Sequence, residues 1–180
     1  KACTKAGLTA KNKNSFFIAK KGSDYMHQHF YSRRELHHHL ASAAAQSNYY
    51  APLTLLILQI DNFADFCRLL SPIAQDRLLD ETEKVIGRLA PHQAFCARWS
   101  GRKFALLIND YTAEQAGNIA ADIAKELLIS RFDGYLGTLA IKPKISCGTA
   151  TYPQTPLFEL GPQAESNIGK SVHTWRQIAL

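Results

Sequence analysis

The sequence predicts one α/β domain of the α+β type, with a mainly antiparallel central sheet flanked by helices. Its 180 residues match the length of a single ordinary domain. Hydrophobic residues make up 46% and charged residues 20% of the chain, which excludes a disordered, collagen-like or coiled-coil protein. The predicted elements follow the order strand, helix, two hairpin-linked strands, helix, strand, and this βαββαβ pattern is the strongest indication of the fold.

The first predicted elements are a helix and a buried strand. Apolar residues recur every four positions from Leu36, which predicts an amphipathic helix over 32–46. A break follows over 48–52. The mostly apolar segment 53–60 is too short for a typical helix, so we expect a central strand that is buried on both faces.

Two helices and a hairpin come next. A short helix is predicted over 63–70, and a longer one over 72–89 begins at a Ser-Pro pair, a favoured helix start. Strands are expected over 94–99 and 103–109. Gly101 lies in the turn between them, and we expect it to supply the positive φ of a tight hairpin.

The C-terminal half predicts a helix, a strand and a weaker final helix. The helix covers 112–130 and is capped by its first residue, a threonine. Residues 133–137 are loop-like. A strand is expected over 139–152, with a start weakened by Pro143, and a last helix over 163–180.

The excess positive charge lies entirely near the N-terminus. Six of the 21 Lys and Arg residues precede the first acidic residue, Asp24, which leaves 15 basic residues to balance 15 acidic ones. We therefore predict a basic linker over 1–24 and a domain over 25–180. A nucleic-acid-binding arm is the alternative for the tail, but such a partner would require a basic surface on the domain as well, so no nucleic-acid partner is expected.

The sequence favours a cytoplasmic protein, either free or as the cytoplasmic part of a larger, membrane-attached one. No apolar stretch approaches the roughly 20 residues that span a bilayer, so no membrane contact is expected for this fragment. Four cysteines, Cys3, Cys67, Cys96 and Cys147, are scattered without a CxxC pair, which argues against a disulfide framework or a zinc site. Cys96 and Cys147 lie in strand-like runs and are expected to be buried.

Three consecutive histidines, His37, His38 and His39, do not predict a metal site. Consecutive helical positions point about 100° apart, so at most two could share a face. We interpret them as helix-surface residues.

Four segments resemble, in order, the motifs of GGDEF domains, a family that makes cyclic di-GMP from two GTP molecules. They are YSRREL (31–36, like "NRR"), LTLLILQIDNF (53–63, like "DIDxF"), FCARWSGRKFALLI (95–108, like "RYGGDEFALLL") and ISCGTATYP (145–153, like "SIGVAxYP"). The resemblance implies a GGDEF or nucleotidyl-cyclase-like fold.

The chain departs from the family at the metal site. The five positions of the hairpin motif are Ser100, Gly101, Arg102, Lys103 and Phe104. The resemblance implies that the metal-holding second acid is replaced by Lys103, and the other metal ligand, the first Asp of "DID", by Gln59. Magnesium prefers hard oxygen ligands, which Lys and Arg do not offer. We therefore expect no catalytic residues, no metal and no other cofactor.

The nucleotide and inhibitory positions are also altered. The family's guanine-binding Asn falls on Cys67, whereas its guanine-contacting Asp is kept as Asp76. The inhibitory "RxxD" motif falls on Pro91 and Ala94, so no inhibitory site is expected. The Arg of "RYGG" is Arg98, for which we expect a structural ion pair and stacking on an aromatic ring.

The resemblance predicts an inactive GGDEF domain that regulates other domains of the same protein, such as a sensor or an EAL domain, or a signalling partner protein. The alternative is an allosteric module that binds GTP weakly, without turnover, through Asp76, Arg102 and Lys103, since Arg and Lys can meet phosphate directly. Residual cyclase activity is the least favoured reading. The oligomeric state is left open.

Overall fold

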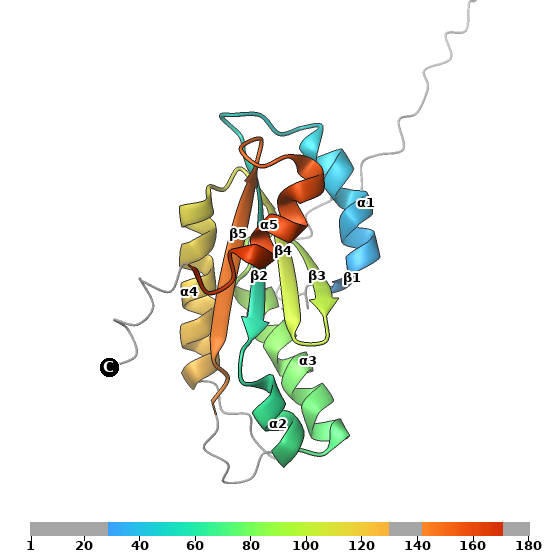
Figure 1. Ribbon diagram of the computed structural model, residues 1–180, viewed down its shortest axis with the longest axis vertical. Coiled ribbons are helices and arrows are strands. Elements are labelled where there is room, and N and C mark those ends of the chain that lie inside the picture. Colours follow the sequence, from blue (N-terminus) through green and yellow to red (C-terminus); the bar gives the residue numbers. More distant parts are fainter. Residues whose placement is uncertain (1–28, 130–141, 171–180) are drawn as a thin grey trace, which may run out of the picture.

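A five-stranded sheet forms the centre of the protein in the computed structural model, which describes residues 29–129 and 142–170 (Figure 1). The strands are β1 (Tyr31–Ser32), β2 (Leu53–Ile60), β3 (Phe95–Ser100), β4 (Lys103–Asn109) and β5 (Ile145–Tyr152). Their order across the sheet is β1-β3-β4-β2-β5. Only the β1–β3 pair is parallel among these strands, so the predicted, mainly antiparallel sheet is confirmed.

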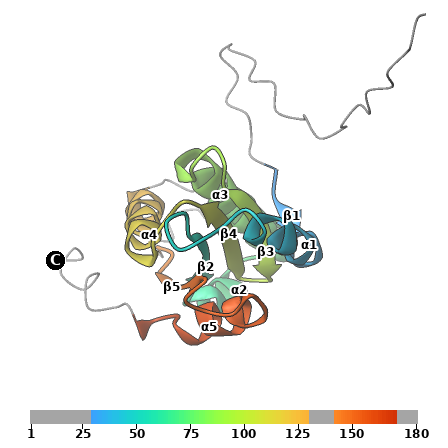
Figure 2. The ribbon, with the colours of Figure 1, turned by 90° about the horizontal axis from the view of Figure 1, so that it is seen from above.

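Helices cover both faces of this sheet. They are α1 (Arg33–Ala44), α2 (Phe63–Leu69), α3 (Pro72–Leu89), α4 (Ala113–Ile129), the 3₁₀ turn η1 (Leu157–Glu159) and α5 (Leu160–Ser166). Figure 2 shows α3 and α4 over one face and α1 and α5 over the other. Within the described part of the chain, no helix is long and apolar enough to cross a membrane.

Side-chain caps fix where several helices begin. Ser32 Oγ accepts a hydrogen bond from the backbone N–H of Glu35, while the Glu35 carboxylate accepts one from the backbone N–H of Ser32 at 2.7 Å. The bond from the Ser32 N–H, together with one from Ser32 Oγ to the same carboxylate oxygen at 2.8 Å, holds the pKa of Glu35 below its usual range. Thr112 and Gln115 exchange the same pair of bonds before α4, which confirms the predicted cap.

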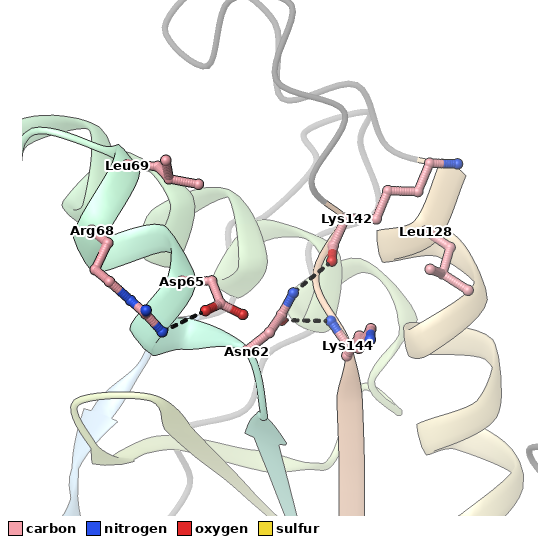
Figure 3. Close-up of a pocket in the computed structure, with 7 residues that line it drawn as sticks. All are labelled: Asn62, Asp65, Arg68, Leu69, Leu128, Lys142 and Lys144. Atoms are coloured by element: carbon pink, nitrogen blue, oxygen red, sulfur yellow. Dashed lines mark hydrogen bonds and ion pairs between the residues drawn. The ribbon is translucent and has the colours of Figure 1, made fainter.

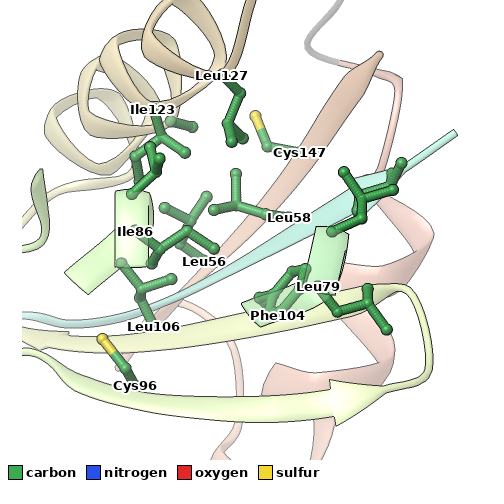
Figure 4. Close-up of a cluster of buried hydrophobic side chains, with 14 of the residues drawn as sticks. Leu56, Leu58, Leu79, Ile86, Cys96, Phe104, Leu106, Ile123, Leu127 and Cys147 are labelled. Atoms are coloured by element: carbon green, nitrogen blue, oxygen red, sulfur yellow. The ribbon is translucent and has the colours of Figure 1, made fainter. Parts of the chain in front are cut away.

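The central strand β2 belongs to two hydrophobic cores at once. Successive side chains of a strand point to opposite faces, so Leu56 and Leu58 lie in the core beneath α3 and α4, where Figure 4 shows them beside Ile86 and Ile123. Leu55 and its odd-numbered neighbours lie in the second core beneath α1 and α5. This confirms the prediction of a strand buried on both faces.

Helix α5 rests directly on the backbone of β5. A Cβ built on Gly148 would lie 2.1 Å from the carbonyl oxygen of Ala164, so only glycine allows this approach. The Asn167 side chain adds a hydrogen bond from Nδ2 to the Thr149 carbonyl at 2.9 Å. The short helix is thereby fixed against the sheet.

The ends of the described chain differ from the prediction. The two-residue strand β1 was not predicted. It is fixed by pairing with β3 and by Tyr31, whose ring stacks on Phe95 with centroids 4.2 Å apart. Strand β5 begins at Ile145, later than predicted. Helix α5 begins at Leu160 and ends at Ser166, so a helix over 163–180 is wrong in its start and at residues 167–170.

The hairpin turn is tight without the expected backbone conformation. Gly101 does not adopt a positive φ; among the described non-glycine residues, Asp110 does, at 61°. The pairing between β3 and β4 shifts between Arg98 and Ser100, so Trp99 forms a bulge.

The predicted burial of two cysteines is confirmed. Cys96 and Cys147 are buried, and burial raises the pKa of their thiols to about 12 and about 11. Cys67 is exposed, and His37, His38 and His39 lie exposed on α1. Several predictions concern residues that the structure does not describe: the linker over 1–24, Cys3, the loop over 133–137, the strand start at 139–141 and the helix end at 171–180.

Candidate functional site

The altered hairpin motif lies beside the end of β2. Lys103 is the register partner of Gln59, so the structure brings together the two positions at which the sequence predicted lost metal ligands. Ser100, Gly101 and Arg102 are exposed at the turn, whereas Phe104 is buried in the first core. The Arg102 carbonyl accepts a hydrogen bond from the Ile60 N–H at 3.0 Å, which ties the turn to β2.

Gln59 is held by neighbouring side chains. Its Nε2 donates a hydrogen bond to Asp61 Oδ1 at 3.0 Å, and Ser146 Oγ donates to the same oxygen at 2.6 Å. The nearby carboxylate of Asp61 therefore serves as an acceptor that joins the ends of β2 and β5.

Lys103 forms an ion pair with a residue that the sequence analysis did not single out. Its Nζ lies 2.5 Å from Glu165 Oε1 on α5. The hydrogen bond from Lys103 holds the pKa of Glu165 below its usual value; burial opposes this effect, while the Trp99 indole and the charges of Lys103 and Arg33 reinforce it. The partners are 62 residues apart in the sequence. The residues around Glu165 show no motif that would have predicted the pair.

Trp99 lies beside the Lys103–Glu165 ion pair. Its ring lies beneath the Arg33 guanidinium, 4.1 Å from the ring centroid, as in a cation–π contact. Gly161 leaves room for the indole, since a Cβ there would lie 2.8 Å from a ring carbon. Trp99 Nε1 is buried without a hydrogen bond of ordinary geometry, yet close enough to Glu165 to act on its carboxylate.

The first predicted guanine position, Cys67, contacts the residue that precedes the second, Asp76. Cys67 Sγ donates to Gln75 Oε1 at 3.4 Å, and Gln75 Nε2 donates to the Leu70 carbonyl at 3.0 Å. Asp76, the next residue along, is exposed. Among the described residues, no hydrogen bond or ion pair connects Asp76 or Arg102 with Lys103.

The positions of the inhibitory motif form part of a turn. The Ala94 N–H donates to the Pro91 carbonyl at 2.8 Å, and neither side chain offers a charge. Arg98 makes the structural contacts expected of it: its guanidinium pairs with Glu83 at 2.6 and 2.7 Å and lies 5.2 Å from the Phe104 ring centroid. The ion pair joins β3 to α3.

A second concave region lies between α2, α4 and the start of β5 (Figure 3). It is a cavity of about 630 Å³, lined by Asn62, Asp65, Arg68, Leu69, Leu128, Lys142 and Lys144. The Asn62 amide donates to the Lys142 carbonyl at 3.0 Å and accepts from the Lys144 N–H at 2.9 Å. The sequence analysis missed this cavity because the residues that Asn62 joins to it, Lys142 and Lys144, lie 80 and 82 residues further along the chain.

Comparison with solved structures supports the fold. The chain is similar to the GGDEF domain of FimX from Pseudomonas aeruginosa, with a TM-score of 0.69, 19% identity, and coverage of 79% of this chain and 88% of that one. The active GGEEF domain of a diguanylate cyclase from Vibrio cholerae gives a TM-score of 0.68 at 17% identity, covering 81% and 93%. Diguanylate cyclase SiaD, solved with its activator SiaC from Pseudomonas aeruginosa, gives 0.68 at 19%, covering 79% and 55%.

Sequence comparison assigns the family. No individually curated protein matches the chain significantly. The family model described as "Diguanylate cyclase, GGDEF domain" matches residues 27–171, which is well over half of the chain. This match agrees with the four ordered motifs and with the sheet that carries them, and the chain therefore belongs to the GGDEF family of the diguanylate cyclases.

Proposed function

We propose that this chain is a catalytically inactive GGDEF domain that acts as a regulatory or interaction module in cyclic di-GMP signalling. The observation that carries the proposal is the ion pair of Lys103 with Glu165 at 2.5 Å. A divalent cation beside the hairpin would meet an ammonium where the family has a carboxylate. The one nearby acid on α5 already neutralises that ammonium.

The chemistry of cyclisation explains why this matters. Attack of a ribose hydroxyl on an α-phosphate depends on metal ions that position both oxygens and neutralise the developing charge. Gln59 offers only a neutral amide, and its Nε2 is already bonded to Asp61. Neither residue of the lost pair supplies an anionic oxygen.

A domain without turnover can still regulate by contact. It would bias the active and inactive arrangements of a partner through differential contacts with each. The partner would be another domain of the same protein or a separate signalling protein. The solved complex of SiaD with its activator SiaC supports the second possibility, because that GGDEF-family chain assembles with a regulator.

A turnover assay tests the loss of activity. The full chain is incubated with GTP and Mg²⁺, with the active Vibrio cholerae domain as a positive control. We expect no cyclic di-GMP from this chain, and product formation would overturn the proposal. Calorimetry with GTP, with and without Mg²⁺, follows: saturable binding without turnover would replace regulation by contact with the alternative allosteric GTP-binding module.

Restoring the carboxylates tests the metal argument. We expect a Gln59→Asp, Lys103→Glu double variant to bind Mg²⁺ more tightly than the parent chain. A Gln163→Asp, Lys170→Glu variant carries the same charge change on exposed positions and serves as the matched control. The argument fails if the parent binds Mg²⁺ as tightly as the double variant.

The regulatory role needs a separate test. Residues 25–180 are deleted from a longer protein in which this domain is joined to an enzymatic domain. We expect the activity of the joined domain, or its response to a signal, to change. Full and normally regulated activity after the deletion would contradict the role.

A further inference from the structure

Three hydrogen-bond donors surround one carboxylate at the junction of α1, β3, β4 and α5. Lys103 Nζ contacts Glu165 directly, and Arg33 lies close enough to lower the pKa of that carboxyl. The third donor, Trp99 Nε1, is buried; it makes no hydrogen bond of ordinary geometry, yet it lies close enough to Glu165 to help lower the pKa of the same carboxyl. We call Arg33, Trp99 and Lys103 the anion cradle.

The anion cradle carries more positive than negative charge. Arg33 and Lys103 contribute two cations, and Glu165 contributes one anion. Arg33 contacts the Trp99 ring directly and lies 3.5 Å from His37 Nε2, and its charge acts on Glu165, which it shares with Lys103. Glu165 is 32% exposed, so the carboxylate can be reached from solvent.

The donors are fixed in place before any ligand arrives. Trp99 is only 3% exposed, with Gly161 close to its ring carbons and the Arg33 guanidinium over its ring. Lys103 is held in the β4 ladder opposite Gln59. Donors that are ordered in advance lose little entropy when they bind.

We infer that the anion cradle is a binding site for phosphate-type oxyanions, and that Glu165 occupies it in cis and excludes external phosphate. Arg and Lys both suit phosphate oxygens, and the Trp99 N–H, which makes no hydrogen bond of ordinary geometry to Glu165, is a third donor for such an oxygen. An anion that displaced Glu165 would also break the ion pair that holds α5 to the hairpin. The site therefore couples phosphate binding to the attachment of α5.

This inference rests on the proposed function in one respect, namely that no divalent cation occupies the hairpin edge. The proposed function and this inference can be contradicted by different experiments. Cyclic di-GMP production would overturn the proposed function, whereas the inference is tested in EDTA, where cyclisation cannot occur.

The test removes the internal anion and titrates with inorganic pyrophosphate. The full chain carries Trp175→Phe, so that Trp99 is the sole tryptophan and reports binding by fluorescence. Glu165→Ala and Glu165→Gln are compared with Glu159→Ala, which removes the same charge from an exposed residue. Circular dichroism verifies that each variant is folded.

We expect both Glu165 variants to bind pyrophosphate at least about tenfold more tightly than the parent, a change of about 1.4 kcal/mol. Glu159→Ala should behave like the parent, and adding Lys103→Met to Glu165→Ala should abolish the gain. The inference is overturned if the Glu165 variants gain nothing, if Glu159→Ala gains equally, or if the gain survives Lys103→Met.

A second titration with GTP in EDTA identifies the source of the phosphate. Equal affinity for GTP and pyrophosphate would assign the site to free phosphates. Tighter binding of GTP that also disappears with Lys103→Met would assign it to nucleotides. Both outcomes support the site, and GTP binding that is insensitive to Lys103→Met would contradict it.

Discussion

At the scale of single residues, the positive charge of Lys103 is compensated by an ion pair within the protein instead of by solvent. Replacing a carboxylate by an ammonium in a half-buried position is costly unless a counter-ion is available. Glu165 provides that counter-ion from α5. The altered motif is therefore part of the structure that stabilises this domain.

The Glu165 pair should make stability depend on pH in the acid range. The pKa of Glu165 is lowered in the folded state from its usual value of 4.5. Its contribution is therefore present above that value and is lost as the pH falls through the lower, folded pKa. We expect Glu165→Gln to cost about 1 kcal/mol at pH 7, with a difference from the parent that disappears as the pH falls well below 4.5.

Thermal unfolding of the parent and Glu165→Gln between pH 3 and pH 7 measures this effect. Glu159→Gln is the control, because Glu159 is exposed and has no ion pair in the described structure. A stability difference for Glu165→Gln that stayed constant over this whole range would show that the ion pair is not its source.

At the scale of elements, the contact of α5 with β5 depends on one glycine. Gly148→Ala would place a Cβ 2.1 Å from the Ala164 carbonyl oxygen, and a backbone atom cannot give way as a flexible side chain can. Overpacking of this kind costs about 1–3 kcal/mol, occasionally more. We expect Gly148→Ala to destabilise the domain by at least that amount.

Gly117→Ala is the matched control, measured in the same denaturant titration. Gly117 lies within α4, and a Cβ there would meet nothing within 4 Å. Alanine is the better helix former, so this variant should stabilise the domain by about 0.5–1 kcal/mol. If the two variants changed the free energy of unfolding equally, backbone contact at Gly148 would not be the cause.

Sequence patterns predicted the long elements and missed those that depend on distant partners. The periodicity of α3 and α4 and the apolar run of β2 are properties of contiguous residues, so their predicted bounds lie close to those observed. By contrast, β1 has two residues and exists only through its pairing with β3.

The same reasoning applies to the candidate site. The sequence identified Gln59 and Lys103 as changed positions, and the structure pairs them in register. Glu165 could not be identified, because its role follows from where α5 is placed by Gly148 and not from its neighbours in the chain. What the altered site does remains a prediction for the experiments above.

At the scale of the whole molecule, the two cores share β2 and should unfold together. Leu56 points into the core under α3 and α4, and Ile57 into the core under α1 and α5; both are fully buried. We expect Leu56→Ala and Ile57→Ala each to cost about 2–5 kcal/mol. In each variant, far-UV circular dichroism and tryptophan fluorescence should report one common transition.

Separate transitions for the two probes would show that the cores are independent. A conservative exposed substitution, Gln93→Ala, provides the baseline for both measurements. If only one of the Leu56→Ala and Ile57→Ala variants lost stability, only one face of β2 would stabilise the domain.

The parallel pairing of β1 with β3 determines how the domain would respond to a pull from upstream. Tyr31 and Ser32 run in the same direction as Ala97 and Arg98, and the Tyr31 ring lies flat on Phe95. Tension applied along β1 would load these bonds in shear, so they would have to break together instead of one after another. The domain is thus mechanically coupled to its N-terminal flank through the same strand, β3, that leads into the altered hairpin.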